Sequence, residues 1–458
     1  MKKELVLCMF TVSVLIAVLV QNIYAGVVKS IIAMQVESVN FLPFDEVPLV
    51  YADSPQVFTT LWDRANTETI RVAIFGDSQE TSPAGRGDVY VARMNYEAFL
   101  RYGSVSETRV SSRGEYGNGS FPGFGAWLLN GTVDVQGESL TRLDSTLLLP
   151  NIGASANSTK NFGTNINGQR FGRLTVLRPD GLNLPPGAEV PLGNYFCAGS
   201  TVRAQVFAST FSSSGEINYI SRPTNNVTIG DFTSLPVVNN AMVLGLENGV
   251  YDIKFGFTDP LPFNGFEYQQ LELVGTDDSK LTEIVGMRYV SDSCVGGMVF
   301  QDFSAGGYTA KSFLTNHSNA DKLFKALEFH AAIIHVGAND VIANTSAVEF
   351  YADIKNLISM IRRFQNNDKF PIILMVDSFV KFLNTSQTIE YDKYAGVEYE
   401  IARKDSYVKF VNTRRATDAL GLRESDPITV DLFLIDSVHY TDFGGRIIAN
   451  IDINGMLD

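Results

Sequence analysis

The feature that most constrains the fold is a short apolar run that breaks abruptly into small and polar residues. The run Arg71–Phe75 ends in Val-Ala-Ile-Phe, and Gly76-Asp77-Ser78 follows it directly. An apolar run of this length is typical of a parallel strand buried on both faces. Gly76 permits a sharp turn after the strand, which would place Ser78 at the carboxyl edge where open α/β sheets bind ligands. Alone the pattern is weak, because Gly-Asp-Ser is also ordinary turn chemistry.

Strands that alternate with helices surround this run and return in the last third of the chain. Such alternation predicts an α/β fold, a parallel sheet covered by helices on both faces in three α/β/α layers. Residues 26–56 are expected to be an extended lead-in, and a helix starting at Asp88 is expected to bury Val89, Ala92, Tyr96, Phe99 and Leu100. The later strands are expected at 298–303, 331–336, 371–376 and 407–411, and the helices at 57–65, 320–329, 347–364, 391–403 and after Gly444.

Between these two parts the composition and the hydrophobic pattern of the chain change. Residues 104–290 are rich in Gly, Asn, Ser and Thr, and short alternating segments occur at 173–177, 201–208, 250–257 and 270–274. Several such strands with turn-rich links predict a β-sandwich. Because the first strand precedes this segment and the others follow it, the sandwich must be an insertion. Its alternating Tyr251, Phe255 and Phe257 are expected to be core residues, although exposed rings there could stack on sugars.

The resulting domain prediction has four segments: a signal peptide at 1–25, the two parts of the sheet domain at 26–103 and 291–458, and the inserted sandwich at 104–290. Met1-Lys2-Lys3, an apolar run to Val20 and a small-residue end have the pattern of a secretory signal. We therefore expect a secreted or periplasmic protein without stable membrane association. The net charge of −14 argues against nucleic acid as a partner.

The cysteines leave an alternative open. With the signal removed, Cys197 and Cys294 remain. They could form one disulfide in an oxidising compartment or stay as two buried thiols.

A serine nucleophile requires a base, a group that orients the base, and donors for the oxyanion. The chain has four histidines. His335 lies in a predicted buried strand and is expected to be a core residue, His330 ends a helix, and His317 sits in a polar loop. His439 follows Asp436 by three residues, so the carboxylate can fold back and hold the imidazole in one tautomer.

Two further segments could supply oxyanion donors. Gly337-Ala338-Asn339-Asp340 follows a predicted strand, so the Asn339 amide would project from the same sheet edge as Ser78. Gly307 follows another strand and, lacking a Cβ, can bring its backbone N–H close to a substrate. Together with the Ser78 amide these make three donors, although either residue alone could merely close a turn.

Taken together, these four segments, Gly76-Asp77-Ser78, Gly307, Gly337-Ala338-Asn339-Asp340 and Asp436-Ser437-Val438-His439, resemble the SGNH/GDSL hydrolases. The resemblance covers residues 71–103 and 298–450, and implies Ser78 as nucleophile, His439 as base and Asp436 as its orienter. It implies an oxyanion hole formed by Ser78, Gly307 and Asn339. Gly307 is assigned over Gly306 because the family often has a threonine two residues later, here Thr309.

The chain departs from this family in two ways. Gln79 replaces the usual leucine after the serine, which is expected to make the pocket mouth more polar. The large insertion resembles the arrangement in cell-wall and polysaccharide esterases, in which a sandwich lies beside the active site and is a candidate carbohydrate-binding unit.

The hypothesis from sequence is an exported serine esterase that removes short acyl groups, above all acetyl, from carbohydrate through an acyl-serine intermediate. No metal or organic cofactor is implied. One alternative is an O-acyltransferase that uses the same triad. Another is a carbohydrate-binding or adhesive protein without activity.

Overall fold

The structure is a computed structural model that describes most of the predicted sheet domain and selected strands of the insertion. The described residues are 41–77, 79, 89–107, 127–130, 162–164, 170–172, 201–209, 217–224, 238–242, 253–257, 268–275, 281–304, 307–315, 320–378, 380, 383–419, 433–434 and 438–458. The predicted signal peptide lies outside them. Within the described part, no helix is both long and apolar enough to cross a bilayer.

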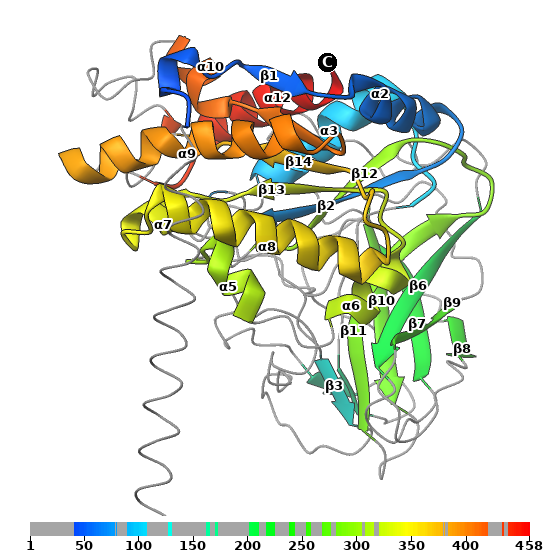
Figure 1. The fold of residues 1–458 in the computed structure, drawn as a ribbon. Coiled ribbons are helices and arrows are strands. Elements are labelled where there is room, and N and C mark those ends of the chain that lie inside the picture. Colours follow the sequence, from blue (N-terminus) through cyan, green and yellow to red (C-terminus); the bar gives the residue numbers. More distant parts are fainter. Residues whose placement is uncertain are drawn as a thin grey trace, which may run out of the picture.

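A six-stranded sheet forms the centre of the molecule, as the alternating pattern predicts (Figure 1). Five of its strands run parallel to one another, and the sixth, the edge strand β1, pairs antiparallel with β15. The order across the sheet is β1 (Val50–Ala52), β15 (Val408–Val411), β14 (Ile372–Met375), β13 (Ala331–His335), β2 (Ile70–Gly76) and β12 (Met298–Asp302).

Strand β2 is the point where the strand order reverses. The chain passes from β2 to its neighbour β12 on one side and then to β13 on the other. The carboxyl ends of β12 and β13 therefore flank the end of β2, where the register pairs His335 with Gly76 and Asp302 with Ile74. Ligands of open α/β sheets bind at such a switch point.

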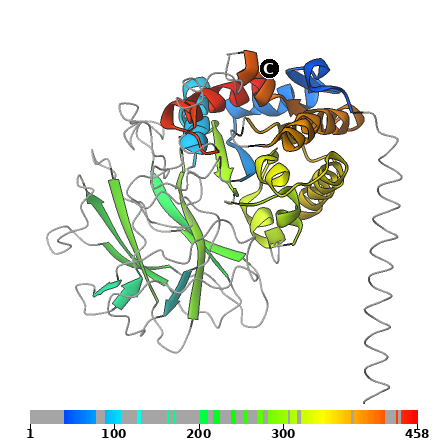
Figure 2. The same ribbon diagram turned by 90° about the vertical axis from the view of Figure 1, so that its left-hand side faces the viewer.

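Helices cover both faces of the sheet and bury a separate apolar core on each. Ala73 and Phe75 of β2 face one core, which is closed by α8 (Ala347–Gln365), α9 (Thr385–Lys404) and α6 (Ala320–Leu327). Val72 and Ile74 face the other, closed by α2 (Pro55–Asp63), α3 (Val89–Tyr102) and α12 (Asp442–Leu457). Figure 2 shows α3 and α12 across the sheet from the yellow and orange helices. The predicted α/β/α layers are confirmed for the sheet domain.

Most predicted elements are found close to their predicted positions, and the exceptions have local causes. Helix α9 begins six residues earlier than expected, where Asn384 and Gln387 form a capping box. The 26–56 segment, predicted only as extended, contributes the three-residue strand β1. Short helices also follow three strands closely: α5 (Ala310–Thr315), α7 (Ala338–Ile342) and α10 (Thr413–Ala419).

The predicted buried face of α3 is wrong at the three positions whose side chains the structure describes. Leu100 is 57% exposed, and Tyr96 and Phe99 are only half-buried. The buried side is instead formed by Tyr90, Val91, Met94, Asn95 and Ala98. The first turns of this helix carry apolar residues on several sides, so its sequence does not decide which side packs against α12 and β12.

The described strands of the insertion form two antiparallel sheets, drawn in green below the helices in Figure 2. The sandwich packing of these sheets and the boundaries at 104 and 290 stay predictions. The strand predicted at 173–177 lies outside the described residues. One sheet has the order β4 (Phe162–Thr164), β5 (Arg170–Gly172), β10 (Tyr268–Gly275), β7 (Ile217–Thr224), β8 (Val238–Met242), and the other β3 (Trp127–Asn130), β11 (Leu281–Ser291), β6 (Val202–Ser209), β9 (Ile253–Phe257).

The aromatic residues of β9 do not lie in the core, contrary to the prediction. Phe255 and Phe257 are 48% and 45% exposed, and their ring centroids lie 5.7 Å apart in an edge-to-face arrangement. Gly256 between them is buried. The alternation is as predicted, but on this edge strand the glycine side faces inward. Tyr251 lies outside the described residues.

The insertion is joined to the sheet domain by apolar packing and by ion pairs. Phe207 of β6 is fully buried in the core that contains Phe75 and Phe303. Glu107 accepts hydrogen bonds from Arg71 of β2 and from Arg288 of β11. Cys294, between β11 and β12, is disulfide-bonded, and its partner lies outside the described residues. The pairing with Cys197 stays a prediction.

Candidate functional site

The turn after β2 is organised by the Asp77 carboxylate. Asp77 is fully buried, and its Oδ1 accepts a 2.8 Å hydrogen bond from the backbone N–H of Gln79. This contact spans Ser78, the predicted nucleophile, which itself lies outside the described residues. The other oxygen, Oδ2, accepts a 3.0 Å hydrogen bond from the Asn339 side-chain amide. Asp77 therefore connects the serine turn with the turn after β13.

The turn after β13 presents Asn339 at the start of α7. Gly337 precedes this helix with φ +150°, a conformation that side chains rarely adopt, so glycine suits this position. The next N–H, from Ala338, donates a 2.6 Å hydrogen bond to Asp377 Oδ2. Asn339 is half-buried, and its amide nitrogen carries two hydrogens, of which Asp77 accepts one. The predicted oxyanion role of Asn339 would use the second hydrogen.

Gly307, after β12, is exposed and has φ +79°, in the left-handed region that favours glycine. Helix α5 begins three residues later, and the N–H of its first residue, Ala310, donates to the Asp340 carboxylate at 3.1 and 3.3 Å. Burial raises the pKa of Asp340 to about 8. This contact connects the Gly307 segment with the Asn339 segment.

His439 is half-buried and lies in a loop that is closed at both ends. Tyr440 forms a β-bridge with Leu434, and the N–H of Thr441 donates to Phe433 O. Thr441 then caps α12, with its hydroxyl accepting a hydrogen bond from Gly444 N. The loop is therefore anchored to the start of a long helix. Asp436, the predicted orienter of His439, lies outside the described residues.

Gln79 does not occupy a pocket mouth, so the prediction of a more polar mouth is wrong. Its side chain is 3% exposed and points into the protein. The amide nitrogen donates to Val438 O at 3.2 Å, and the amide oxygen accepts from the Tyr440 hydroxyl at 2.8 Å. The residue after Ser78 thus contacts both chain neighbours of His439.

Buried ionisable groups lie behind these turns. His335, the last residue of β13, is fully buried, as predicted, and its Nε2 lies 3.3 Å from Asp377 Oδ1. Burial raises the pKa of Glu398 well above its ordinary value, and the nearby Asp377 carboxylate adds to the rise. His330 accepts a hydrogen bond from Arg71 N at the opposite edge of the sheet, and His317 lies outside the described residues.

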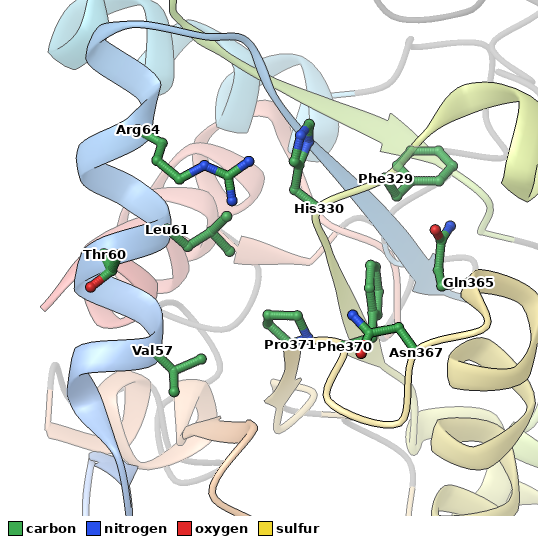
Figure 3. A pocket seen from close by; sticks show the side chains of 10 residues that line it. All are labelled: Val57, Thr60, Leu61, Arg64, Phe329, His330, Gln365, Asn367, Phe370 and Pro371. Atoms are coloured by element: carbon green, nitrogen blue, oxygen red, sulfur yellow. The ribbon is translucent and has the colours of Figure 1, made fainter.

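Figure 3 shows a pocket of about 290 Å³ at the amino edge of the sheet, away from these turns. Its lining includes Leu61 of α2 and Arg64 just after this helix on one side, and Phe370 and Pro371 on the other. Its charged groups have protein partners, since Arg64 pairs with Glu68. Among the described residues, no group of His, Cys, Asp and Glu is arranged to hold a metal ion.

The contacts thus bring together the four segments that the sequence singled out. Asp77 joins the first to the third, Ala310 and Asp340 join the second to the third, and Gln79 joins the first to the fourth. Of the predicted site residues, Asn339, Gly307 and His439 are placed in these segments, whereas Ser78 and Asp436 lie outside the described residues.

Sequence reasoning missed the supporting residues Asp377, Ser378 and Tyr440 and assigned Gln79 a different role. A signal for two of them exists, because Asp377-Ser378 follows the apolar strand β14 just as Asp77-Ser78 follows β2. Polar residues directly after a buried strand lie at the carboxyl edge of the sheet. This pattern could have assigned Asp377 and Ser378 to the same edge as the candidate site.

Comparison with known proteins gives matches in structure alone: no family model matches the sequence, and no curated protein matches it. A solved peptidoglycan O-acetylesterase superposes with a TM-score of 0.54 at 14% identity, covering 89% of this chain and 98% of that one. An acetylxylan esterase from Geobacillus stearothermophilus matches 35% of this chain and 73% of its own at 19% identity and TM-score 0.28.

A protein of the lipolytic G-D-S-L family from Veillonella parvula matches 34% of this chain and 79% of its own, at 10% identity and TM-score 0.28. The first of the three matches extends over nearly the full length of both proteins. At this level of identity the similarity concerns the fold. The chain therefore shares its fold with this peptidoglycan O-acetylesterase.

Proposed function

We propose that the protein is an exported serine esterase that removes acetyl and other short acyl groups from carbohydrate. The observation that carries the proposal is the set of contacts that joins the four segments at one edge of the sheet. These segments supply a serine, a histidine with an aspartate three residues before it, and backbone and amide donors. Ester hydrolysis through an acyl-serine needs this set of groups.

In the proposed mechanism, Ser78 Oγ attacks the ester carbonyl while His439 takes its proton. Asp436 orients the imidazole, and the Ser78 N–H, the Gly307 N–H and the Asn339 amide stabilise the oxyanion. His439 then gives the proton to the departing sugar oxygen, leaving an acyl-serine. Water attacks this ester with His439 again as base, which releases the carboxylate product and restores Ser78. Removing one oxyanion donor lowers kcat by about 100- to 1000-fold in comparable sites.

Carbohydrate is the proposed substrate class for two reasons. The full-length structural match is to a peptidoglycan O-acetylesterase. The insertion also exposes two phenylalanine rings, Phe255 and Phe257, on its edge strand β9. Aromatic faces can stack against sugar rings at low entropic cost. Export is supported by the charged start and apolar run of the first residues.

The test is acetate release from O-acetylated peptidoglycan and from acetylated xylan, with Ser78→Ala as the control. We expect release by the native protein from at least one polymer, covalent labelling by a fluorophosphonate probe, and loss of both in Ser78→Ala. Native activity that survives in Ser78→Ala would contradict the mechanism. Transfer of the acetyl group to an added sugar acceptor in place of water would instead identify an acyltransferase.

A further inference from the structure

The side chain of Gln79 connects the two halves of the proposed catalytic machinery. It follows Ser78 directly, and it bonds to Val438 O and to the Tyr440 hydroxyl, the residues on either side of His439. Gln79 and Val438 are 359 residues apart in the sequence. A single buried side-chain amide therefore connects the segment of the predicted nucleophile with the segment of the predicted base.

The chemistry of the partners fixes how this amide is oriented. Val438 O can only accept a hydrogen bond, so the NH2 group must face it, and the amide oxygen must face Tyr440. The tyrosine hydroxyl gives its only proton to Gln79. The Ser378 hydroxyl, 2.7 Å away, must therefore donate to the Tyr440 oxygen.

The network continues into the helical layer of the protein. Ser378 follows β14, and its carbonyl accepts a 2.8 Å hydrogen bond from the Tyr391 hydroxyl of α9. Gln79, Ser378, Tyr391 and Tyr440 are all buried. A buried network in which each member is bonded holds its members in one arrangement, because any alternative leaves a polar group unpaired.

We propose that Gln79 is a positioning residue that sets the distance and angle between Ser78 and His439. This inference rests on the proposed function, in which His439 transfers a proton at two points of each half-reaction. A leucine at this position, the usual residue in the SGNH/GDSL hydrolases, has no group that could bond to Val438 O and Tyr440. In this chain the hydrogen bonds of Gln79 hold the histidine loop against the serine turn.

The decisive variant is Gln79→Met, which keeps the length of the side chain and removes both hydrogen bonds. Two esters report on it: nitrophenyl acetate, whose leaving group departs without a proton, and a simple alkyl acetate, whose leaving group must receive one. A displaced His439 slows serine attack on both esters but slows leaving-group protonation only for the alkyl ester. We expect kcat to fall about 10-fold for the aryl ester and about 100-fold for the alkyl ester, with KM nearly unchanged.

A matched control is available in Asn95→Leu. Asn95 is also a buried amide, and it bonds to the backbone of Phe300 in β12 through both its nitrogen and its oxygen. Its replacement should lower the melting temperature but leave the ratio of alkyl to aryl activity unchanged. Tyr440→Phe removes the hydroxyl that bonds to Gln79, so it should change the ratio in the same direction as Gln79→Met, and the two effects should not add.

The outcomes separate this inference from the proposed function. If the native protein neither reacts with the fluorophosphonate probe nor hydrolyses nitrophenyl acetate, the proposed function is wrong. If the native protein does both and Ser78→Ala does neither, the function stands. An unchanged alkyl-to-aryl ratio in folded Gln79→Met, or in folded Tyr440→Phe if the first variant does not fold, would then overturn the positioning role alone.

Discussion

Glu107 is the residue whose loss should weaken the connection between the sheet domain and the insertion most. Its carboxylate binds Arg71 of β2 through two hydrogen bonds of 2.5 and 2.8 Å. It also accepts a 2.7 Å hydrogen bond from Arg288 of β11, whose Nε donates to Gln205 of β6. One carboxylate therefore balances two guanidinium groups that come from different parts of the fold.

The expected effect of Glu107→Ala follows from the burial of this cluster. The side chains of Glu107 and Arg288 are 5% and 9% exposed, and burial lowers the pKa of Arg288. Removing one partner of a buried ion pair leaves an uncompensated charge and costs about 3 to 5 kcal/mol. Glu328, 3.6 Å from Arg71, cannot replace Glu107, because it is 76% exposed and such pairs contribute about 0 to 1 kcal/mol.

The two tryptophans of the chain allow both parts to be followed in one experiment. Trp62 is buried in α2 of the sheet domain, and Trp127 lies in β3 of the insertion. Two single-tryptophan proteins, Trp62→Phe and Trp127→Phe, would be unfolded in urea with and without Glu107→Ala. We expect Glu107→Ala to lower the free energy of unfolding by about 3 to 5 kcal/mol, most clearly for the tryptophan of the insertion.

Glu328→Ala serves as the control, because it removes an exposed carboxylate that contacts the same Arg71. It should change the free energy of unfolding by less than about 1 kcal/mol. A Glu107→Ala effect that is equally small would refute the reasoning. It would mean that water or other groups neutralise the two arginines, and that the insertion is held mainly by apolar contacts such as those of Phe207.

Two further predictions concern stability and substrate. Burial raises the pKa of Asp340 to about 8 from an ordinary 3.8, so the folded protein keeps a proton that the unfolded chain releases. The contribution of Asp340 to the free energy of unfolding is full below about pH 4 and falls by up to about 1.4 kcal/mol per pH unit as pH rises to about 8. Asp340→Asn should therefore gain stability relative to the native protein over this range in urea unfolding. A difference between the two proteins that does not change with pH would contradict this prediction. Phe255→Ala with Phe257→Ala should lower kcat/KM on acetylated polymer about 10-fold and leave nitrophenyl acetate unchanged; equal loss on both would assign these rings to stability alone.

The sheet domain could be predicted because its central strands are short and mostly apolar. Runs such as Ala331–His335 and Ile372–Met375 are buried on both faces, so their sequences identify them without knowledge of their neighbours. Order along the chain then places their carboxyl ends at one edge. Strand β1 lacks such a signal, since three residues are too few for a pattern and only its pairing with β15 identifies it.

Amphipathic faces were harder to predict, because they depend on what packs against them. In α3 the sequence offers apolar residues on several sides, and contact with α12 and β12 selects the side of Met94 over that of Leu100. In β9 the alternation of Phe255, Gly256 and Phe257 is visible in the sequence, but the neighbouring structure decides which side is inward. A period in the sequence predicts two faces without saying which one is buried.

Gln79 shows the same limit within the candidate site. The sequence identifies a polar residue where leucine is usual, and an exposed pocket mouth is the simplest expectation for such a residue. Burial of a glutamine is favourable only if its donors and acceptor find partners, and these come from Val438 and Tyr440 at the other end of the chain. Because those partners also flank His439, a residue expected to change substrate access instead connects the segments of the predicted nucleophile and base.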